Sequence, residues 1–417
     1  MSMPDVDPRS RQGSGAVQIL IATAIGGGSG YILTIFAGAS LGAVRYGVYA
    51  VFWSALYLVV SAISGIQPEV SRATRPVERN SDGRPLVRNF AIVTAASIGL
   101  ATLLSSPLWI GKVFHTTGYG LVVPLAIGLA SYAIVAALSG VLFGLQVWRA
   151  IAALIAIDGV LRLVITGSLL LVTHNLNILA WGLVAPFFIA PIAVWFVVRK
   201  RVVGHFTVDV TGYRQLIWNV ARTVVGAAAI GTLISGFPLL LGATSSSDPR
   251  SQVAALIFAI NLTRAPIVIV VLSLQSFLVV FFRSRREHYL RYLGAILGAI
   301  AVVTALVTIV VAWLGPWVLE TFFGHGYALG SVVLGALVGS AGAVAFLCAT
   351  GPAVLALGRH ALYTTGWVVA ALVTLGILLL PLPVTERTIL ALWIGPLSGL
   401  LVHVAVLVWK PRLPQGH

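Results

Sequence analysis

A few charged side chains that interrupt long apolar runs are the residues of this sequence best suited to chemistry. Asp158 and Arg162 lie four residues apart in the apolar run 151–173, so on a helix they share a face and can form an ion pair. Thr166 continues the same stripe. Two interpretations stay open: the pair only neutralises its own charge within a helix bundle, or it lines a polar cavity.

Arg264 interrupts a second apolar run, 253–281, and no acidic residue lies near it in the sequence. Asn261 precedes it by three residues and Gln275 follows it by eleven, so the three form a polar stripe on a helix. An unpaired charge in an apolar medium is costly, so we expect Arg264 to face a water-filled cavity that attracts anions. Together with Arg162 it would offer a phosphate-bearing substrate two positive contacts in a central cavity.

The run 46–66 carries a stripe of hydroxyl side chains that includes Tyr57, with Trp53 beside it. Such a face is suited to contact sugars through its hydroxyls and its aromatic surface. The same side chains also form hydrogen bonds between membrane helices. Both interpretations stay open.

Other conspicuous residues favour packing over chemistry. Gly26 and Gly30 lie in an apolar run with no Gly-Lys-Ser/Thr after them, which favours close helix packing over a phosphate-binding loop. His403 has no carboxylate near it, so we expect a satisfied buried histidine rather than a proton relay. The single cysteine, Cys348, excludes a disulfide framework and a cysteine-based metal site. No cofactor is expected.

The elements that position these residues are long apolar helices. Of the 417 residues, 59% are hydrophobic and 9% are charged, against about a quarter charged in a soluble domain. A membrane-spanning helix needs about 20 apolar residues. The sequence therefore predicts an all-α polytopic membrane protein with about twelve spans, at 16–40, 46–66, 89–111, 119–145, 151–173, 178–198, 223–243, 253–281, 292–315, 329–356, 366–383 and 389–409.

The basic residues between these spans give the chain an orientation. If the N-terminus is cytoplasmic, 20 of the 26 Lys and Arg residues lie in inner segments and only Arg45, Lys112, Arg250 and Arg387 lie outside. This bias predicts cytoplasmic termini at both ends. It also explains the net charge of +15 by topology and contact with anionic membrane lipids, rather than by nucleic-acid binding.

The longest inner segment divides the chain into two halves. We predict an N-terminal lobe of six spans over 1–198, a cytoplasmic linker over 199–222 with an interfacial helix, and a C-terminal lobe over 223–417. The segment 238–250 is weakly similar in sequence to the segment 33–45, which suggests that the two lobes are parallel repeats. Pro238 and Pro266 are candidate kinks in the second lobe.

Three short segments carry a resemblance to a known family. Residues 41–50 read LGAVRYGVYA and are followed by an apolar helix and by Gly-Ile-Gln-Pro at 65–68; residues 144–149 read GLQVWR and lead into the run that holds Arg162; residues 355–359 read LALGR. These segments resemble helix junctions of bacterial polysaccharide flippases, which belong to the multidrug/oligosaccharidyl-lipid/polysaccharide exporter (MOP) superfamily.

The resemblance implies two six-helix lobes with a MATE-like fold that rock between inward-open and outward-open states. It implies a flippase in the bacterial cytoplasmic membrane that passes a polyprenyl-diphosphate-linked oligosaccharide across the bilayer for cell-surface polysaccharide, with other polysaccharide-assembly membrane proteins as partners. The expected cavity residues are Arg162, Arg264, Asp158, Asn261, Tyr57 and Gln275. A small-molecule exporter of the same fold is the alternative. A membrane glycosyltransferase fits less well, because the outer loops are short and poor in acidic residues.

Overall fold

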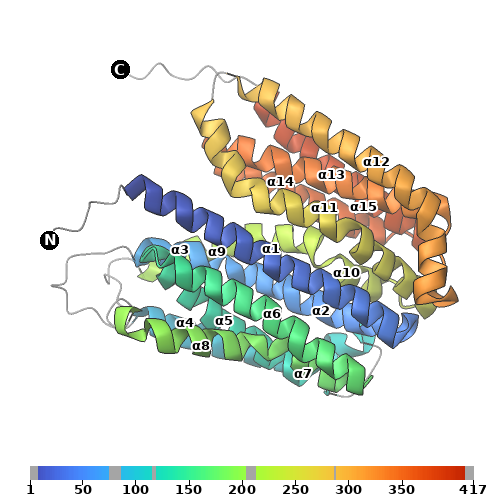
Figure 1. The fold of residues 1–417 in the computed structure, drawn as a ribbon, viewed down its shortest axis with the longest axis horizontal. Coiled ribbons are helices and arrows are strands. Elements are labelled where there is room, and N and C mark those ends of the chain that lie inside the picture. Colours follow the sequence, from blue (N-terminus) through green and yellow to red (C-terminus); the bar gives the residue numbers. More distant parts are fainter. Residues whose placement is uncertain (1–7, 75–85, 115–118, 203–212, 286–287, 409–417) are drawn as a thin grey trace. The chain divides into compact units, whose positions relative to one another are not determined.

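The computed structural model describes residues 8–74, 86–114, 119–202, 213–285 and 288–408, and within these ranges the regular structure is helical throughout. The helices follow one another along the chain as α1 (Pro8–Leu41), α2 (Ala43–Ser64), α3 (Ile66–Ala73), α4 (Leu86–Val113), α5 (Val122–Gly144), α6 (Trp148–Val172), α7 (Leu176–Val184), α8 (Pro186–Val202), α9 (Tyr213–Ile234), α10 (Phe237–Thr244), α11 (Arg250–Ser284), α12 (Tyr289–Phe323), the short η2 (His325–Tyr327), α13 (Ser331–Ala356), α14 (His360–Leu378) and α15 (Val384–Val408) (Figure 1).

The predicted all-α, multi-span fold is confirmed. Within the described residues, eleven segments are long and apolar enough to cross a membrane, where α2 with α3 and α7 with α8 each count as one. Each matches a predicted span. The remaining predicted span, 253–281, lies inside α11, a single helix of 35 residues that continues through Pro266.

Two boundaries differ from the prediction. The span predicted at 223–243 is interrupted at Ser235 and Gly236, and Pro238 stands in the first turn of α10, where proline fits without disrupting a helix. The predicted linker 199–222 is partly helical, since α8 continues to Val202 and α9 begins at Tyr213. Residues 203–212 of that linker lie outside the described ranges.

Contacts divide the chain into two compact units, which we call unit 1 (1–41 and 51–228) and unit 2 (42–50 and 229–417). Two helices are shared between them. The first residues of α2 belong to unit 2 and the rest of that helix to unit 1, while α9 begins in unit 1 and ends in unit 2.

In unit 1, α1 packs against α6 at a crossing made of glycines. A Cβ added at Gly159 of α6 would lie 2.5 Å from the Cα of Gly26 in α1, so the two backbones are nearly in contact there. The predicted packing role of Gly26 is therefore confirmed. Small residues of this kind let membrane helices approach closely.

In unit 2, α13 is the central helix and packs against α11, α12 and α15. In the most apolar 18-residue stretch of α13, 72% of the residues are buried, whereas in that of α12 only 6% are. The outward side chains of α12 are nevertheless apolar and include Val302, Leu306 and Ile309. An apolar face of this length without a protein partner in the described chain is the face expected to meet lipid.

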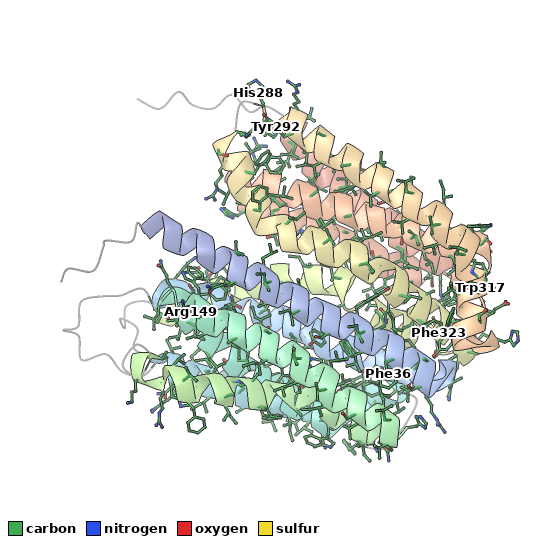
Figure 2. The ribbon with its side chains drawn as sticks, in the orientation of Figure 1. Phe36, Arg149, His288, Tyr292, Trp317 and Phe323 are labelled. Carbon is green, nitrogen blue, oxygen red and sulfur yellow. The ribbon has the colours of Figure 1, made fainter. Side chains whose placement is uncertain are left out.

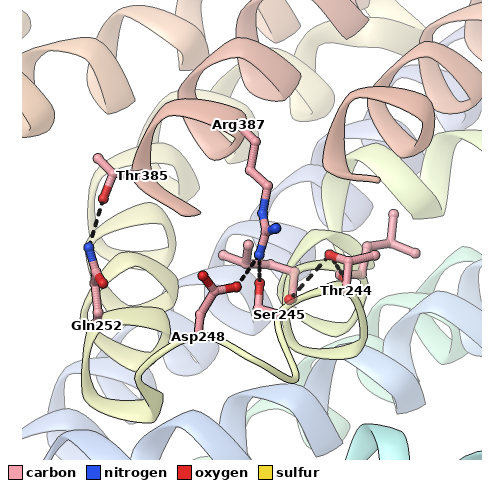
Figure 3. Close-up of polar contacts among 8 residues, drawn as sticks. Thr244, Ser245, Asp248, Gln252, Thr385 and Arg387 are labelled. Atoms are coloured by element: carbon pink, nitrogen blue, oxygen red, sulfur yellow. Dashed lines mark hydrogen bonds and ion pairs between the residues drawn. The ribbon is translucent and has the colours of Figure 1, made fainter. Parts of the chain in front are cut away.

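A polar cluster joins the turn between α10 and α11 to the start of α15 within unit 2 (Figure 3). Arg387 forms an ion pair with Asp248 and donates a hydrogen bond of 2.8 Å to the Ser245 hydroxyl. Gln252 of α11 donates to the Thr385 hydroxyl at 3.2 Å. The buried Arg387 thus fixes this turn from the side, in addition to the backbone hydrogen bond of 3.1 Å that the Asp248 amide donates to the Ser245 carbonyl.

Candidate functional site

The ion pair predicted in the fifth span is present on one face of α6. One terminal nitrogen of Arg162 lies 2.7 Å from each carboxylate oxygen of Asp158. The arginine is 2% exposed, whereas the side chain of Asp158 is 27% exposed. The charge of Arg162 is therefore neutralised inside unit 1 by a carboxylate that still reaches the surface of that unit.

The second terminal nitrogen of Arg162 donates to the backbone carbonyl of Leu183, near the end of α7. Helix α7 stops before Pro186, and the last carbonyls of a helix have no partner within it. The negative end of the helix dipole lies at the same place, which favours a cation. Arg162 thus compensates the break between α7 and α8.

Aromatic rings surround the Arg162 guanidinium. Its central carbon lies 4.6 Å from the ring centre of Phe187 and 5.3 Å from that of Tyr57, within the range of cation–π attraction. Trp53 stacks on Tyr57 with 5.6 Å between ring centres, and Tyr132 lies 5.1 Å from Phe187. The predicted Tyr57 is therefore next to the predicted Arg162 and Asp158.

Arg264 of α11 is in a different electrostatic situation. It is 5% exposed and donates to the backbone carbonyl of Leu233 at 3.3 Å. Among the residues that the structure describes, its Nε has no hydrogen-bond acceptor and no carboxylate forms an ion pair with it. Among the described residues, this buried positive charge has as its hydrogen-bond acceptor a carbonyl in the last turn of α9, at the negative end of that helix.

The two arginines make the same pair of contacts in the two units. Leu233 lies in the last turn of α9, and Phe237, four residues later, has its ring centre 5.9 Å from the Arg264 guanidinium. In unit 1 the acceptor Leu183 and the ring Phe187 are also four residues apart. Each unit therefore has an interrupted helix. A carbonyl near the end of its first segment accepts a hydrogen bond from an arginine, and the guanidinium of that arginine also lies against a phenylalanine ring. Interrupted helices of this kind form ion and substrate sites in membrane transporters.

The other two predicted site residues are engaged elsewhere in unit 2. Asn261 donates to the Tyr46 hydroxyl at 3.1 Å, and Gln275 lies 3.5 Å from the backbone carbonyl of Cys348 in α13. Neither bond involves Arg264, although helical spacing puts all three on a polar stripe. Asn261 instead connects α11 to the part of α2 that belongs to unit 2.

His403 behaves as a structural residue. It is fully buried, and its ring nitrogens lie 3.1 Å from the Thr350 hydroxyl and 3.1 Å from the Tyr363 carbonyl. Its ring also stacks on Tyr363 with 5.9 Å between centres. The predicted satisfied histidine is confirmed.

Sequence reasoning missed the partners that complete the arginine environments: the Leu183 and Leu233 carbonyls and the rings of Phe187 and Phe237. A signal for the two rings was present, although none marked the carbonyls. Each phenylalanine adjoins a proline, in Pro186-Phe187 and Phe237-Pro238, and proline early in an apolar run marks the start of a new helix.

No family model matches this sequence. Similar proteins exist in mycobacteria. The uncharacterized protein Rv3630 of Mycobacterium tuberculosis is 32% identical over 411 residues, covering 94% of this chain and 92% of that protein. A second M. tuberculosis protein, Rv1510, is 30% identical over 398 residues, covering 94% of this chain and 90% of its own length. The chain belongs to this mycobacterial family.

Solved structures relate the family's fold to the MOP superfamily. The inward-closed lipid II flippase MurJ matches with a TM-score of 0.70 and 12% identity, over 94% of this chain and 88% of that protein. An inward-facing multidrug resistance MATE transporter of the MOP superfamily matches with a TM-score of 0.64 and 13% identity, over 95% and 96% of the two chains. The chain is a multi-pass membrane protein with the MOP transporter fold. The MATE-like fold that the sequence predicted is thereby confirmed.

Proposed function

We propose that this protein is a transporter, specifically a flippase that moves a polyprenyl-diphosphate-linked oligosaccharide across the bacterial cytoplasmic membrane for cell-surface polysaccharide biosynthesis. The glycan would pass through the polar interior while its lipid tail stays in the bilayer. Both termini would face the cytoplasm, and other membrane proteins of polysaccharide assembly would supply and receive the substrate.

The observation that carries the proposal is the buried charge of Arg264. A charged side chain at membrane depth costs about 2.5–3.5 kcal/mol on insertion scales, and Arg264 has no carboxylate to offset that cost within the described chain. A diphosphate would supply the missing negative charge and would accept a hydrogen bond from the Arg264 Nε–H, which has no acceptor among the described residues. Guanidinium groups bind phosphate through paired hydrogen bonds.

The Arg162 environment supports a sugar as the other part of the substrate. Trp53 and Tyr57 form a stacked aromatic surface next to the partly exposed carboxylate of Asp158. Aromatic faces bind the apolar faces of sugar rings, and a carboxylate accepts hydrogen bonds from hydroxyls. Proton uptake by Asp158 would release Arg162 toward the diphosphate and would give the transport cycle an ion-coupled step.

Net transport requires that the substrate or an ion stabilise one facing state over the other. Arg162 and Arg264 each hold the carbonyl end of an interrupted helix. A substrate phosphate that takes over the guanidinium donors would release those carbonyls. Binding would then change the hydrogen bonds at the two helix breaks. The substrate would therefore make different contacts with the protein in the inward-facing and outward-facing states.

The test replaces Arg264 and Arg162 with glutamine, singly and together, in a strain that lacks the chromosomal gene. We expect each variant to reach the membrane at the parental level and export to fall at least about tenfold, as for the loss of one charged hydrogen-bonded contact. Lipid-linked oligosaccharide should accumulate on the cytoplasmic leaflet. Arg250→Gln, which removes an exposed charge, is the matched control. Parental export by the double variant would rule out a role for either arginine.

A small-molecule exporter is the second candidate, because the MATE transporter mentioned above has the same fold over 95% of this chain. This function would make the deletion strain sensitive to cationic or amphipathic drugs without any accumulation of lipid-linked sugar. The two phenotypes separate the candidates in one strain.

A further inference from the structure

The two ends of unit 2 differ in charge. At the end where α11, α13 and α15 finish and α12 and α14 begin, the described charged residues are all basic: Arg283, Arg285, Arg291 and Arg359. Arg286 and Glu287, which follow Arg285 in the sequence, lie outside the described residues. At the opposite end three arginines are balanced by three carboxylates: Arg45, Arg250, Arg387, Asp248, Glu320 and Glu386.

Arg285 is the best positioned of the basic residues. Its NH1 donates to the Tyr292 hydroxyl at 2.6 Å, and its guanidinium carbon lies 4.9 Å from the ring centre of Tyr292 and 5.1 Å from that of Phe281. Two aromatic rings thus hold the guanidinium, while the residue as a whole remains exposed. A positioned arginine loses less freedom on binding an anion than a free one does.

The surface around Arg285 lies over a cluster of buried hydrophobic side chains. Residues from the ends of α11, α12, α13 and α15, among them Phe282, Leu293 and Val354, form one buried cluster. Tyr289 donates to the Leu407 carbonyl at 2.8 Å, and Arg359 donates to the Val406 carbonyl at 2.6 Å. These bonds satisfy the last carbonyls of α15 and tie three helix ends together.

Helix α12 indicates where this surface lies relative to a bilayer. Figure 2 shows Tyr292 and His288 at one end of unit 2 and Trp317 at the other. Trp313 and Trp317 are 79% and 59% exposed, and Tyr and Trp favour the membrane–water interface. The distance along the helix from Tyr292 to Trp313 is about 32 Å at 1.5 Å per residue, close to the hydrocarbon thickness of about 30 Å. Tyr292 and Arg285 therefore lie at headgroup level.

We propose that the end of α11, with Arg285, and the start of α12 form a binding site for the phosphate of an anionic phospholipid headgroup. Arg285 is the principal ligand, held by Phe281 and Tyr292, and Arg283 and Arg291 supply flanking charge. The acyl chains lie along the exposed apolar face of α12. This site is separate from the buried arginines of the transport proposal and does not depend on it.

The site is tested by native mass spectrometry on the full-length protein, purified in micelles of a non-ionic detergent and titrated with phosphatidylglycerol or phosphatidylcholine. We expect Arg285→Gln to weaken phosphatidylglycerol binding about fivefold, the share of one arginine near an anionic surface. Tyr292→Phe keeps the ring and loses the hydroxyl, and should weaken binding about twofold. Arg250→Gln, an exposed arginine at the opposite end, should bind as the parent does. Unchanged binding by Arg285→Gln, or equal retention of phosphatidylcholine, would overturn the proposal.

A second arm separates a lipid headgroup from a soluble anion, since both present the same phosphate chemistry. Millimolar inorganic phosphate should leave bound phosphatidylglycerol in place, because the acyl chains also contribute to binding. Displacement by submillimolar phosphate would contradict the lipid assignment. If Arg285→Gln does not fold, Arg283→Gln and Arg291→Gln carry the test, with a graded loss of phosphatidylglycerol expected for each.

Discussion

Two arginines buried in similar backbone environments differ in the presence of a carboxylate partner. Arg162 has Asp158 at 2.7 Å, and Arg264 has no such partner among the described residues. The charge of Arg162 is neutralised by Asp158, whereas that of Arg264 is not neutralised by any described carboxylate. This difference makes Arg264 the stronger candidate for contact with an anionic substrate and gives Asp158 a measurable structural role.

Asp158→Asn should destabilise the protein, because it leaves the guanidinium of Arg162 buried without a counter-charge. Loss of one partner of a buried pair costs about 3–5 kcal/mol, and the partial exposure of Asp158 reduces this to about 1–3 kcal/mol. The transition in thermal unfolding of the purified protein should shift down accordingly. Glu320→Gln, an exposed carboxylate, is the control. A variant as stable as the parent would show that the pair adds nothing.

Residue-scale features were predictable from the sequence only where they are local. The Asp158–Arg162 pair follows from helical spacing, so it could be predicted. The hydrogen bond from Asn261 to Tyr46 joins residues 215 positions apart, and no periodicity connects them. The Leu183 and Leu233 carbonyls were equally hidden, because an acceptor on the backbone has no residue type to mark it.

At the scale of helices, the crossing of α1 and α6 depends on the absence of two side chains. Gly159→Val would place a branched side chain where the Gly26 backbone now lies. We expect a loss of about 1–3 kcal/mol, as for overpacking elsewhere, measured as a lower unfolding transition. Gly298→Ala in α12 is the matched control, since a Cβ there meets nothing within 4 Å. Equal effects of the two substitutions would contradict a specific role for the crossing.

The ion pair of Arg387 with Asp248 holds a turn between helices rather than a helix. Arg387→Gln should raise amide hydrogen exchange in residues 245–248 about tenfold, which corresponds to about 1.4 kcal/mol of local opening. Exchange in α13 should not change. Glu386→Gln removes an exposed neighbouring charge and should leave the turn protected. Uniformly faster exchange would indicate global destabilisation instead.

Helix lengths were predictable where the hydrocarbon thickness of the bilayer determines them. Apolar runs of about 20 residues gave spans that match eleven membrane-length segments. The extension of α11 to 35 residues was not predictable, because its polar ends resemble loop sequence. The break between α9 and α10 was predicted only as a kink at Pro238, since the run 223–243 stays apolar across Ser235 and Gly236.

For the whole molecule, the orientation in the membrane is the prediction with the simplest test. Ser284→Cys and His325→Cys would each place a thiol at an exposed position, in a Cys348→Ser background that removes the buried native cysteine. A membrane-impermeant maleimide added to intact cells should label the thiol at position 325 and not that at 284, because basic segments stay cytoplasmic. Permeabilised cells should show both. The reverse pattern would mean the opposite orientation.

Helix α2 has a mechanical consequence, because its two parts belong to different units. About 12 Å of it, residues 43–50, packs with unit 2, and about 21 Å, residues 51–64, packs with unit 1. No glycine or proline lies between Val48 and Ser64, so the helix has no built-in joint where the units divide. Gly42, which has a φ of +69°, precedes the helix and separates it from α1. Any rotation of one unit against the other would therefore bend α2. The bending stiffness of this helix would oppose such a movement and return the helix to its straight form.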